Sequence, residues 1–321
     1  MTAMRPDEPA GPGYPSSRAR PSARPQRRRR SADRRQGVLT RRELLLGGGA
    51  LAVLAAIETI EHTPVGSVVG GARRSAPPGM TVLYRSFRSR VLGHDVAYGI
   101  AWPPGVAPGT RLPVAFGLPG RGGGPASVLA FLSPFLKELV DGGVRPFALA
   151  SVDGGQSYWH RRASGEDRMA MLTAEFVPLC EQRYHLGGSH ARRAGMGWSM
   201  GGYGVLLAAE TWPHLFSSVV ATSPAIWPSY QAMMNGPRDA FDSAADFTAH
   251  DVIGHASRLA GTPLLVECGT KDPFYPYVRD LCAVLPPGAR SHYLPGGGHD
   301  FRSWAKFQPA ALRFVAQHLR G

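Results

Sequence analysis

Gly197-Trp198-Ser199-Met200-Gly201 is the stretch of sequence that decides the fold of this chain. A serine with glycines two residues before and after it is typical of a sharp turn between a β-strand and an α-helix. The glycines carry no Cβ atom, so strand and helix can approach closely around a strained serine. Residues 190–198 can form a short buried strand before the turn, and residues 200–210 can form a helix after it. The stretch therefore predicts an α/β fold that presents a serine hydroxyl at the end of a strand.

The rest of the sequence alternates between strand-like and helix-like segments from Thr81 onward. Strands are expected at residues 81–89, 94–103, 112–118, 146–152, 217–221, 263–268 and 290–294. Helices are expected at residues 126–140, 167–184, 275–285 and 307–319, and an irregular insertion with several aromatic side chains at 226–260. Strands that alternate with helices at this spacing predict a mostly parallel central sheet with helices on both faces.

The positive charge of the chain is concentrated at its amino-terminal end. The formal net charge is +13, and residues 1–42 contain 12 arginines against three acidic residues. The remainder carries a net charge of only +4, which gives no ground for a nucleic-acid-binding domain. Residues 1–40 are rich in proline and arginine and are expected to be a disordered tail. A separate segment, residues 41–60, follows this tail. After it we expect a linker at 61–80 and one domain at 81–321.

That segment, residues 41–60, has the features of an export signal. Thr40-Arg41-Arg42-Glu43-Leu44-Leu45-Leu46 looks like a twin-arginine signal, and an apolar run of about 13 residues, 44–56, overlaps its end. This run is too short for an ordinary transmembrane helix. Leu46 stands where such signals often have lysine, and no convincing cleavage site follows the run, so cleavage near 60–75 and retention as a membrane anchor both stay open. We expect export by the twin-arginine machinery to the medium or the cell envelope.

The cysteines give no sign of a metal or redox site. Cys180, Cys268 and Cys282 contain no C-x-x-C spacing, so neither zinc binding nor thiol redox chemistry is expected. Packed free thiols are the expected state. A Cys180–Cys282 disulfide stays open, because an exported protein would meet an oxidising environment.

Ser199 needs partners to become a nucleophile, namely a general base and a carboxylate that fixes the tautomer of that base. Asp272 follows the strand at 263–268, and His299 follows the strand at 290–294. Both side chains therefore come after the carboxyl ends of strands, which is the edge where open α/β sheets build their sites. The sequence predicts a catalytic triad of Ser199, Asp272 and His299.

Other histidines and carboxylates are weaker candidates for these two roles. His292 lies within a strand and His318 within the last helix, where structural roles are expected. His250 and His255 belong to the insertion and could line a pocket. Asp300, directly after His299, would point elsewhere from a tight turn.

The chemistry also requires two backbone N–H groups that hold the negative charge on the attacked carbonyl oxygen. Met200, directly after the serine, is one expected donor. The glycine-rich loop at 117–124 follows the strand at 112–118 and is expected to supply the other, from Arg121 or Gly122. The loop lacks the lysine of a phosphate-binding loop, so nucleotide binding is not expected.

Several motifs together resemble the esterase D and mycolyltransferase family of α/β-hydrolases, over most of residues 80–321. They lie at residues 176–184, 197–204, 269–272 and 298–304, and the loop at 152–159 is similar to one that borders the acyl site in that family. The resemblance implies an α/β-hydrolase catalytic domain and a Ser–His–Asp mechanism without a metal or an organic cofactor. Tyr158, Trp159 and Trp227 are expected to line an acyl or sugar pocket, although packing in the core explains these aromatic side chains about as well.

The sequence also departs from this family. Pro119-Gly120 stands where many esterases have His-Gly, and the insertion at 226–260 differs in length and content, so substrate specificity does not carry over. We expect an exported serine esterase that acts on small-molecule, lipid-linked or polysaccharide-linked esters. An acyltransferase with the same triad, of the mycolyltransferase or diacylglycerol acyltransferase type, and a catalytically inactive envelope-binding homologue are the alternatives.

Overall fold

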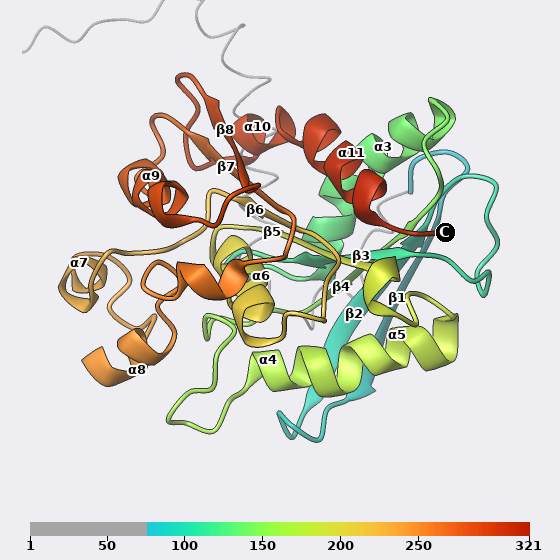
Figure 1. Cartoon of the computed structure of the whole chain (residues 1–321). Coiled ribbons are helices and arrows are strands. Elements are labelled where there is room, and N and C mark those ends of the chain that lie inside the picture. Colours follow the sequence, from blue (N-terminus) through green and yellow to red (C-terminus); the bar gives the residue numbers. More distant parts are fainter. Residues whose placement is uncertain (1–75) are drawn as a thin grey trace, which may run out of the picture. The chain divides into compact units, whose positions relative to one another are not determined.

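A computed structural model of the protein describes residues 76–321 (Figure 1). The predicted tail, export signal and most of the predicted linker, residues 1–75, lie outside the described residues. Within residues 76–321, no helix combines the length and the apolar character needed to cross a membrane.

Eight strands form one sheet in the spatial order β1-β2-β4-β3-β5-β6-β7-β8. The pairs β1–β2 and β2–β4 are antiparallel, and all the other neighbouring pairs are parallel. The α/β class with a mostly parallel sheet, predicted from the sequence, is therefore confirmed. The strands are β1 (Thr81–Arg88), β2 (Asp95–Trp102), β3 (Val114–Leu118), β4 (Ala148–Val152), β5 (Arg193–Trp198), β6 (Val219–Thr222), β7 (Leu264–Gly269) and β8 (Arg290–Leu294).

Helices cover both faces of this sheet. One face carries α3 and α11, which contact each other, and the other face carries α5, α6 and α9 (Figure 1). The helices are α3 (Pro125–Asp141), α4 (Arg168–Met171), α5 (Val177–Tyr184), α6 (Met200–Thr211), α7 (Tyr230–Met234), α8 (Ala244–Ala249), α9 (Tyr275–Val284), α10 (Phe301–Ala305) and α11 (Gln308–His318).

The central strands β3 and β4 consist of apolar and small residues, which suit a position between two layers of helices. Every residue of β3 and β4 is buried, because helices cover both faces of the sheet at this point. Gly117 in β3 allows α3 to lie close, since a Cβ atom built there would come within 2.5 Å of Val128 Cγ1. The parallel strands from β3 to β7 place their carboxyl ends, and the loops that follow them, at one edge.

Two segments differ from the sequence-based expectation. The single helix predicted at 167–184 is divided into α4, a π-helical turn at Leu172–Phe176 and α5. Pro178, near the start of α5, has no N–H group and cannot continue the hydrogen-bond ladder of a regular helix. The insertion predicted to be irregular contains α7 and α8, because Ser229 and Ser243 accept backbone N–H groups and cap the two helices.

Candidate active site

The turn around Ser199 joins β5 to α6 and holds the serine in a strained conformation. Ser199 has φ 55° and ψ −124°, a left-handed backbone that a side chain rarely adopts. Two hydrogen bonds of its own main chain hold it there, from Ser199 N–H to Thr222 O and from Ala225 N–H to Ser199 O. A Cβ atom at Gly201 would lie 2.0 Å from the carbonyl oxygen of Leu118, so only glycine fits there. The sequence requirement for glycine therefore comes from the close approach of α6 to the end of β3.

Hydrogen bonds connect the serine to the predicted base and carboxylate. His299 Nε2 lies 2.9 Å from Ser199 Oγ, and His299 Nδ1 lies 2.8 Å from Asp272 Oδ2. The carboxylate side chain of Asp272 is completely buried, and its Oδ1 accepts the N–H of Phe274 at 2.9 Å. A proton on Nδ1 is therefore donated to Asp272, and Nε2 is left to accept the hydroxyl proton of Ser199. The structure brings all three residues of the predicted triad together in the order that proton transfer requires.

The ring of His299 is also held by aromatic neighbours. The centroid of Trp304 lies 5.0 Å from that of His299 with the rings nearly perpendicular, and Phe274 lies at 5.2 Å. The indole Nε1–H of Trp304 donates to Ser223 Oγ at 3.0 Å, which fixes the orientation of the indole. Sequence reasoning did not assign this supporting role. The only available signal was the place of Trp304 at the end of the motif at 298–304, which also contains His299.

The loop that was predicted to complete the oxyanion site passes next to the serine. A Cβ atom at Gly120 would lie 3.6 Å from Ser199 Cβ. Gly122, one of the two expected donors from this loop, donates its N–H to Gly155 O at 2.9 Å, which leaves Arg121 as the other expected donor. Within residues 76–321, the N–H of Arg121 has no backbone acceptor. The N–H of Met200 belongs to the first turn of α6, where no partner within the helix exists.

The three aromatic residues predicted to contact substrate are buried. Trp159 is 0% exposed and packs against α6, where a Cβ atom at Gly204 would come within 2.5 Å of its ring. The structure thus places Trp159 in the core, against the prediction that it lines a substrate pocket, because the glycine leaves space for the indole. Tyr158 and Trp227 are 3% and 5% exposed, and their ring centroids lie 5.7 Å apart. Burial raises the pKa of Tyr158 to about 12, so its phenol is neutral at ordinary pH.

An aromatic row extends from these residues to His299. Trp227 contacts Phe274 with ring centroids 5.4 Å apart, and Phe274 contacts His299. Trp227 also lines a cavity of about 10 Å³, together with aromatic and aliphatic residues, His250 and Asp251. A space of this size holds about one water molecule, so it cannot take an acyl chain in this conformation.

The remaining ionisable candidates have structural positions. Arg121 forms an ion pair with Asp239 of the insertion, and its guanidinium lies 5.9 Å from the centroid of the Tyr158 ring. Cys180, Cys268 and Cys282 are free thiols in the structure, and the Cys180–Cys282 disulfide left open by the sequence is not formed. Burial raises the pKa of Cys268 to about 12, which makes it an unreactive thiol.

A group of potential metal ligands lies apart from the triad. Within the described residues, His160, Asp246 and His250 have ligand atoms that all lie within 4.8 Å of one another. None of these residues is hydrogen-bonded to Ser199, Asp272 or His299 in the structure.

Comparisons with known proteins agree with this fold. The solved structure of a ferulic acid esterase matches with a TM-score of 0.63 and 20% identity, covering 75% of this chain and 99% of that one. An S-formylglutathione hydrolase from Agrobacterium tumefaciens matches with 0.63 and 18%, covering 77% and 98%. The fluorophosphonate-binding serine hydrolase FphF of Staphylococcus aureus matches with 0.61 and 17%, covering 74% and 98%. At these identities the likeness shows the α/β-hydrolase fold.

Sequence comparison supplies the family. No curated protein sequence matches the chain. Residues 141–314, more than half of the chain, match the family model described as "Putative esterase". This stretch contains all three residues of the hydrogen-bonded group. The resemblance noted in the sequence is confirmed, and the chain belongs to this esterase family of the α/β-hydrolase fold.

Proposed function

We propose that the protein is a serine esterase that hydrolyses carboxylic esters through an acyl-enzyme on Ser199. The observation that carries this proposal is the continuous hydrogen-bond chain from buried Asp272 through His299 to Ser199 Oγ. Family membership supports the same chemistry, because an esterase of this fold uses an activated serine as its nucleophile.

In the first half of the reaction, Ser199 Oγ attacks the ester carbonyl carbon while His299 Nε2 takes the hydroxyl proton. Asp272 stabilises the imidazolium that forms and keeps its ring in place. The N–H groups of Met200 and Arg121 are the proposed donors to the developing oxyanion, and the positive end of α6 points at the same place. His299 then gives the proton to the departing alcohol, and the acyl group remains bonded to Ser199 Oγ.

In the second half, a water molecule attacks the acyl-enzyme. His299 takes a proton from the water, and the same donors hold the second oxyanion. The carbonyl carbon then releases Ser199 Oγ, which recovers its proton from His299, and the carboxylic acid leaves. No step needs a redox partner or an activated co-substrate.

We propose short or aromatic acyl groups for the substrate, on an alcohol of a small molecule, lipid or polysaccharide. The aromatic row of Trp227, Phe274 and His299 supports an aromatic acyl group, because it brings aromatic rings to the proposed base. The names of two structural neighbours, a ferulic acid esterase and an S-formylglutathione hydrolase, point the same way.

Hydrolysis of a p-nitrophenyl ester series from acetyl to palmitoyl tests both proposals. We expect the highest kcat/KM with short acyl groups, and at least about a 10³-fold loss in Ser199→Ala. A fluorophosphonate probe should label the wild-type protein and leave the variant unlabelled. A labelled protein that hydrolyses none of the esters but transfers acyl groups to trehalose or diacylglycerol would be an acyltransferase. An unlabelled wild-type protein would be an inactive binding homologue.

We further propose that the protein is exported through its twin-arginine segment. The basic pair Arg41-Arg42 ahead of the apolar run at 44–56 supports this proposal. Replacing both arginines with lysine should retain the protein in the cytoplasm, as measured by cell fractionation of the full chain. The same replacement at Arg27-Arg28, in the preceding tail, is the matched control and should leave export unchanged. Equal export of all three forms would contradict the proposal.

A further inference from the structure

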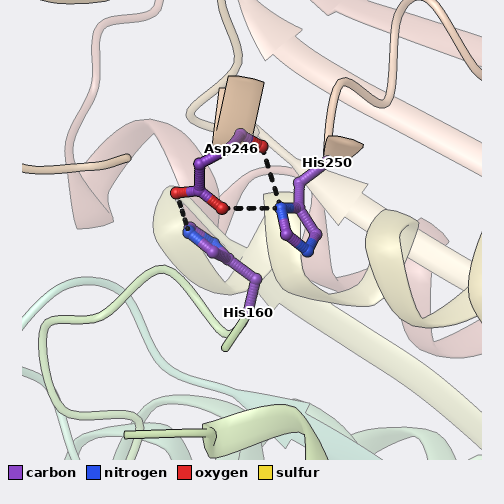
Figure 2. A group of neighbouring side chains, drawn as sticks. All are labelled: His160, Asp246 and His250. Carbon is purple, nitrogen blue, oxygen red and sulfur yellow. Dashed lines mark hydrogen bonds and ion pairs between the residues drawn. The ribbon is translucent and has the colours of Figure 1, made fainter. Parts of the chain in front are cut away.

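A histidine from the loop after β4 meets an aspartate and a histidine of the insertion (Figure 2). His160 lies in the loop between β4 and α4, Asp246 lies in α8, and His250 follows the last residue of that helix. The two histidine rings stack with centroids 4.5 Å apart, and the carboxylate of Asp246 contacts a nitrogen of each ring. Its Oδ2 lies 3.1 Å from His160 Nε2, and its Oδ1 lies 3.0 Å from His250 Nδ1.

The two ring nitrogens of His160 both face oxygen atoms that can only accept hydrogen bonds. Nδ1 lies 3.0 Å from the carbonyl oxygen of Tyr158, and Nε2 lies 3.1 Å from the Asp246 carboxylate. A neutral imidazole has one N–H group, so one of these contacts would set a lone pair against a lone pair. A positive charge at the ring removes this conflict. It can be a second proton, or a cation bound at one nitrogen while the other donates.

The surroundings of His160 fit a metal ligand. Its ring is almost completely buried, and its Nε2 faces the carboxylate of Asp246. The carbonyl oxygen of Tyr158 also accepts the backbone N–H of His160 at 2.8 Å, which holds the Nδ1 side against this oxygen. A histidine that donates one ring N–H to a carbonyl and turns its other nitrogen to a cation has the usual arrangement of a metal ligand.

The spacing of the three side chains suits a small divalent ion. Two ligands of a tetrahedral zinc ion are about 3.4 Å apart, since each bond is about 2.0–2.1 Å long. The distance from His160 Nε2 to Asp246 Oδ2 is 3.1 Å, and that from His250 Nδ1 to Asp246 Oδ1 is 3.0 Å. One ligand atom from each of the three residues lies within 4.8 Å of the other two. Asp246 Oδ2 also accepts the N–H of Asp242, and Tyr203 donates its hydroxyl to the carbonyl oxygen of His250. These bonds orient the ligands from outside, as the outer contacts of metal sites do.

Access and charge also permit an ion. Side-chain exposure rises from 1% for His160 through 15% for Asp246 to 27% for His250, so the group is open on the side of His250, where a water molecule can be the fourth ligand. Arg162, a nearby cation, is paired with Asp242 at 2.8 Å, which offsets its charge. His250 Nδ1 now lies near the backbone oxygen of Asp246. Ion binding would move the proton of His250 from Nδ1 to Nε2.

We propose that His160, Asp246 and His250 bind one divalent transition-metal ion, with zinc as the best match to two imidazole nitrogens and a carboxylate oxygen. The ion connects α8 of the insertion to the loop after β4, and these two segments are distant in sequence. Its role is to fix the insertion on the domain, and it takes no part in the chemistry at Ser199. The site is independent of the proposed esterase activity.

The test is zinc binding by the full chain, purified without a histidine tag and freed of metal with a chelator. Isothermal titration with ZnCl₂ should give one ion per chain, and the melting temperature should rise with zinc concentration. His160→Gln and Asp246→Asn should each weaken binding at least about tenfold. His94→Gln, at an exposed histidine elsewhere, is the matched control and should bind zinc as the wild type does. Ser199→Ala should also bind zinc normally, which separates this test from that of the proposed function.

Cobalt provides a measurement that needs no variant. Co²⁺ added to the metal-free wild-type protein should give the visible absorption bands of a four-coordinate site, and ZnCl₂ should remove them. The proposal is overturned if zinc does not bind, if no such bands appear, or if folded His160→Gln and Asp246→Asn bind zinc as well as the wild type does. If NMR shows the same doubly protonated His160 ring with and without zinc, the three residues form a simple ion pair, and the proposal is overturned as well.

Discussion

Replacing Asp272 with asparagine should remove most of the proposed activity although the side chain keeps its size. Asp272 Oδ1 accepts the N–H of Phe274, and Oδ2 contacts His299 Nδ1. In the variant, the amide oxygen must stay with the Phe274 N–H, because the amide NH₂ group would set a donor against a donor. The NH₂ group then faces His299 Nδ1 and holds it unprotonated. The proton of the ring moves to Nε2, which can no longer accept the proton of Ser199.

The expected magnitude follows from this change of tautomer. The Asp272 side chain is 0% exposed, so no solvent competes for its hydrogen bonds. The same replacement in a serine protease lowers kcat by about 10⁴-fold through the wrong tautomer, and we expect a loss of this order here. At 1.36 kcal/mol per tenfold change, this loss equals about 5 kcal/mol of transition-state stabilisation. KM should change little, because the substituted side chain does not face the substrate.

Steady-state hydrolysis of p-nitrophenyl acetate measures this effect. Asp300→Asn is the matched control: the residue follows His299 directly and caps α10 by accepting the Ser303 N–H at 2.8 Å. Asparagine caps a helix as well as aspartate, so this variant should retain activity within about threefold. A loss of less than about tenfold in Asp272→Asn would refute the tautomer argument. Equal losses in both variants would show a general disturbance of the loop.

Three further predictions concern the support of the site and its response to pH. Gly201→Ala should destabilise the domain by about 3 kcal/mol or more in urea unfolding, because its Cβ atom would lie 2.0 Å from a carbonyl oxygen at the end of β3. Trp304→Phe keeps an aromatic ring beside the proposed base His299 but loses the hydrogen bond to Ser223, so kcat should fall about tenfold, with about 1 kcal/mol lost in stability. The carboxylate of Glu267, 3.8 Å from His292 Nδ1, raises the pKa of His292, so its contribution to stability is full below pH 6.5 and is lost as the pH rises through the raised value. Melting temperatures from acidic to alkaline pH should therefore show a larger difference between wild type and His292→Gln at the acidic end.

Each of these predictions has its own control. Gly124→Ala adds a Cβ atom with nothing within 4 Å, so a stability loss equal to that of Gly201→Ala would contradict the steric argument. Unchanged kcat in Trp304→Phe would show that ring contact alone positions the histidine. His94→Gln removes an exposed histidine. If its melting temperature differed from that of the wild type with the same pH dependence as for His292→Gln, the effect could not be assigned to Glu267.

The sequence predicted the sheet and the hydrogen-bonded triad because local rules determine both. Strands such as β3 and β4 are short apolar runs, and such runs indicate buried strands in an α/β fold. Ser199 is marked by glycines that the turn itself requires. Asp272 and His299 follow strands whose carboxyl ends must share an edge when the sheet is parallel.

The features of the site that the sequence did not show involve contacts between segments that are distant in sequence. The N–H of Gly122, an expected oxyanion donor, bonds to the carbonyl oxygen of Gly155 in a different loop. Trp159 fits the core because Gly204 in α6 leaves space for it, which no pattern around the tryptophan shows. His160 and Asp246 are 86 positions apart, so only the folded chain shows that they meet. Local patterns predict elements and their ends, whereas the pairing of loops depends on tertiary packing.

The place of β8 in the sheet affects when the proposed active site can form during translation. Within residues 76–321, β8 is an edge strand that pairs only with β7, and the loop that carries His299 comes after it. A growing chain can pair β3 with β5 and form the turn around Ser199 before this histidine has been synthesised. The proposed nucleophile therefore exists without its proposed base while the 100 positions from Ser199 to His299 are added. The proposed site is complete only after β8 has joined the sheet and His299 has followed it.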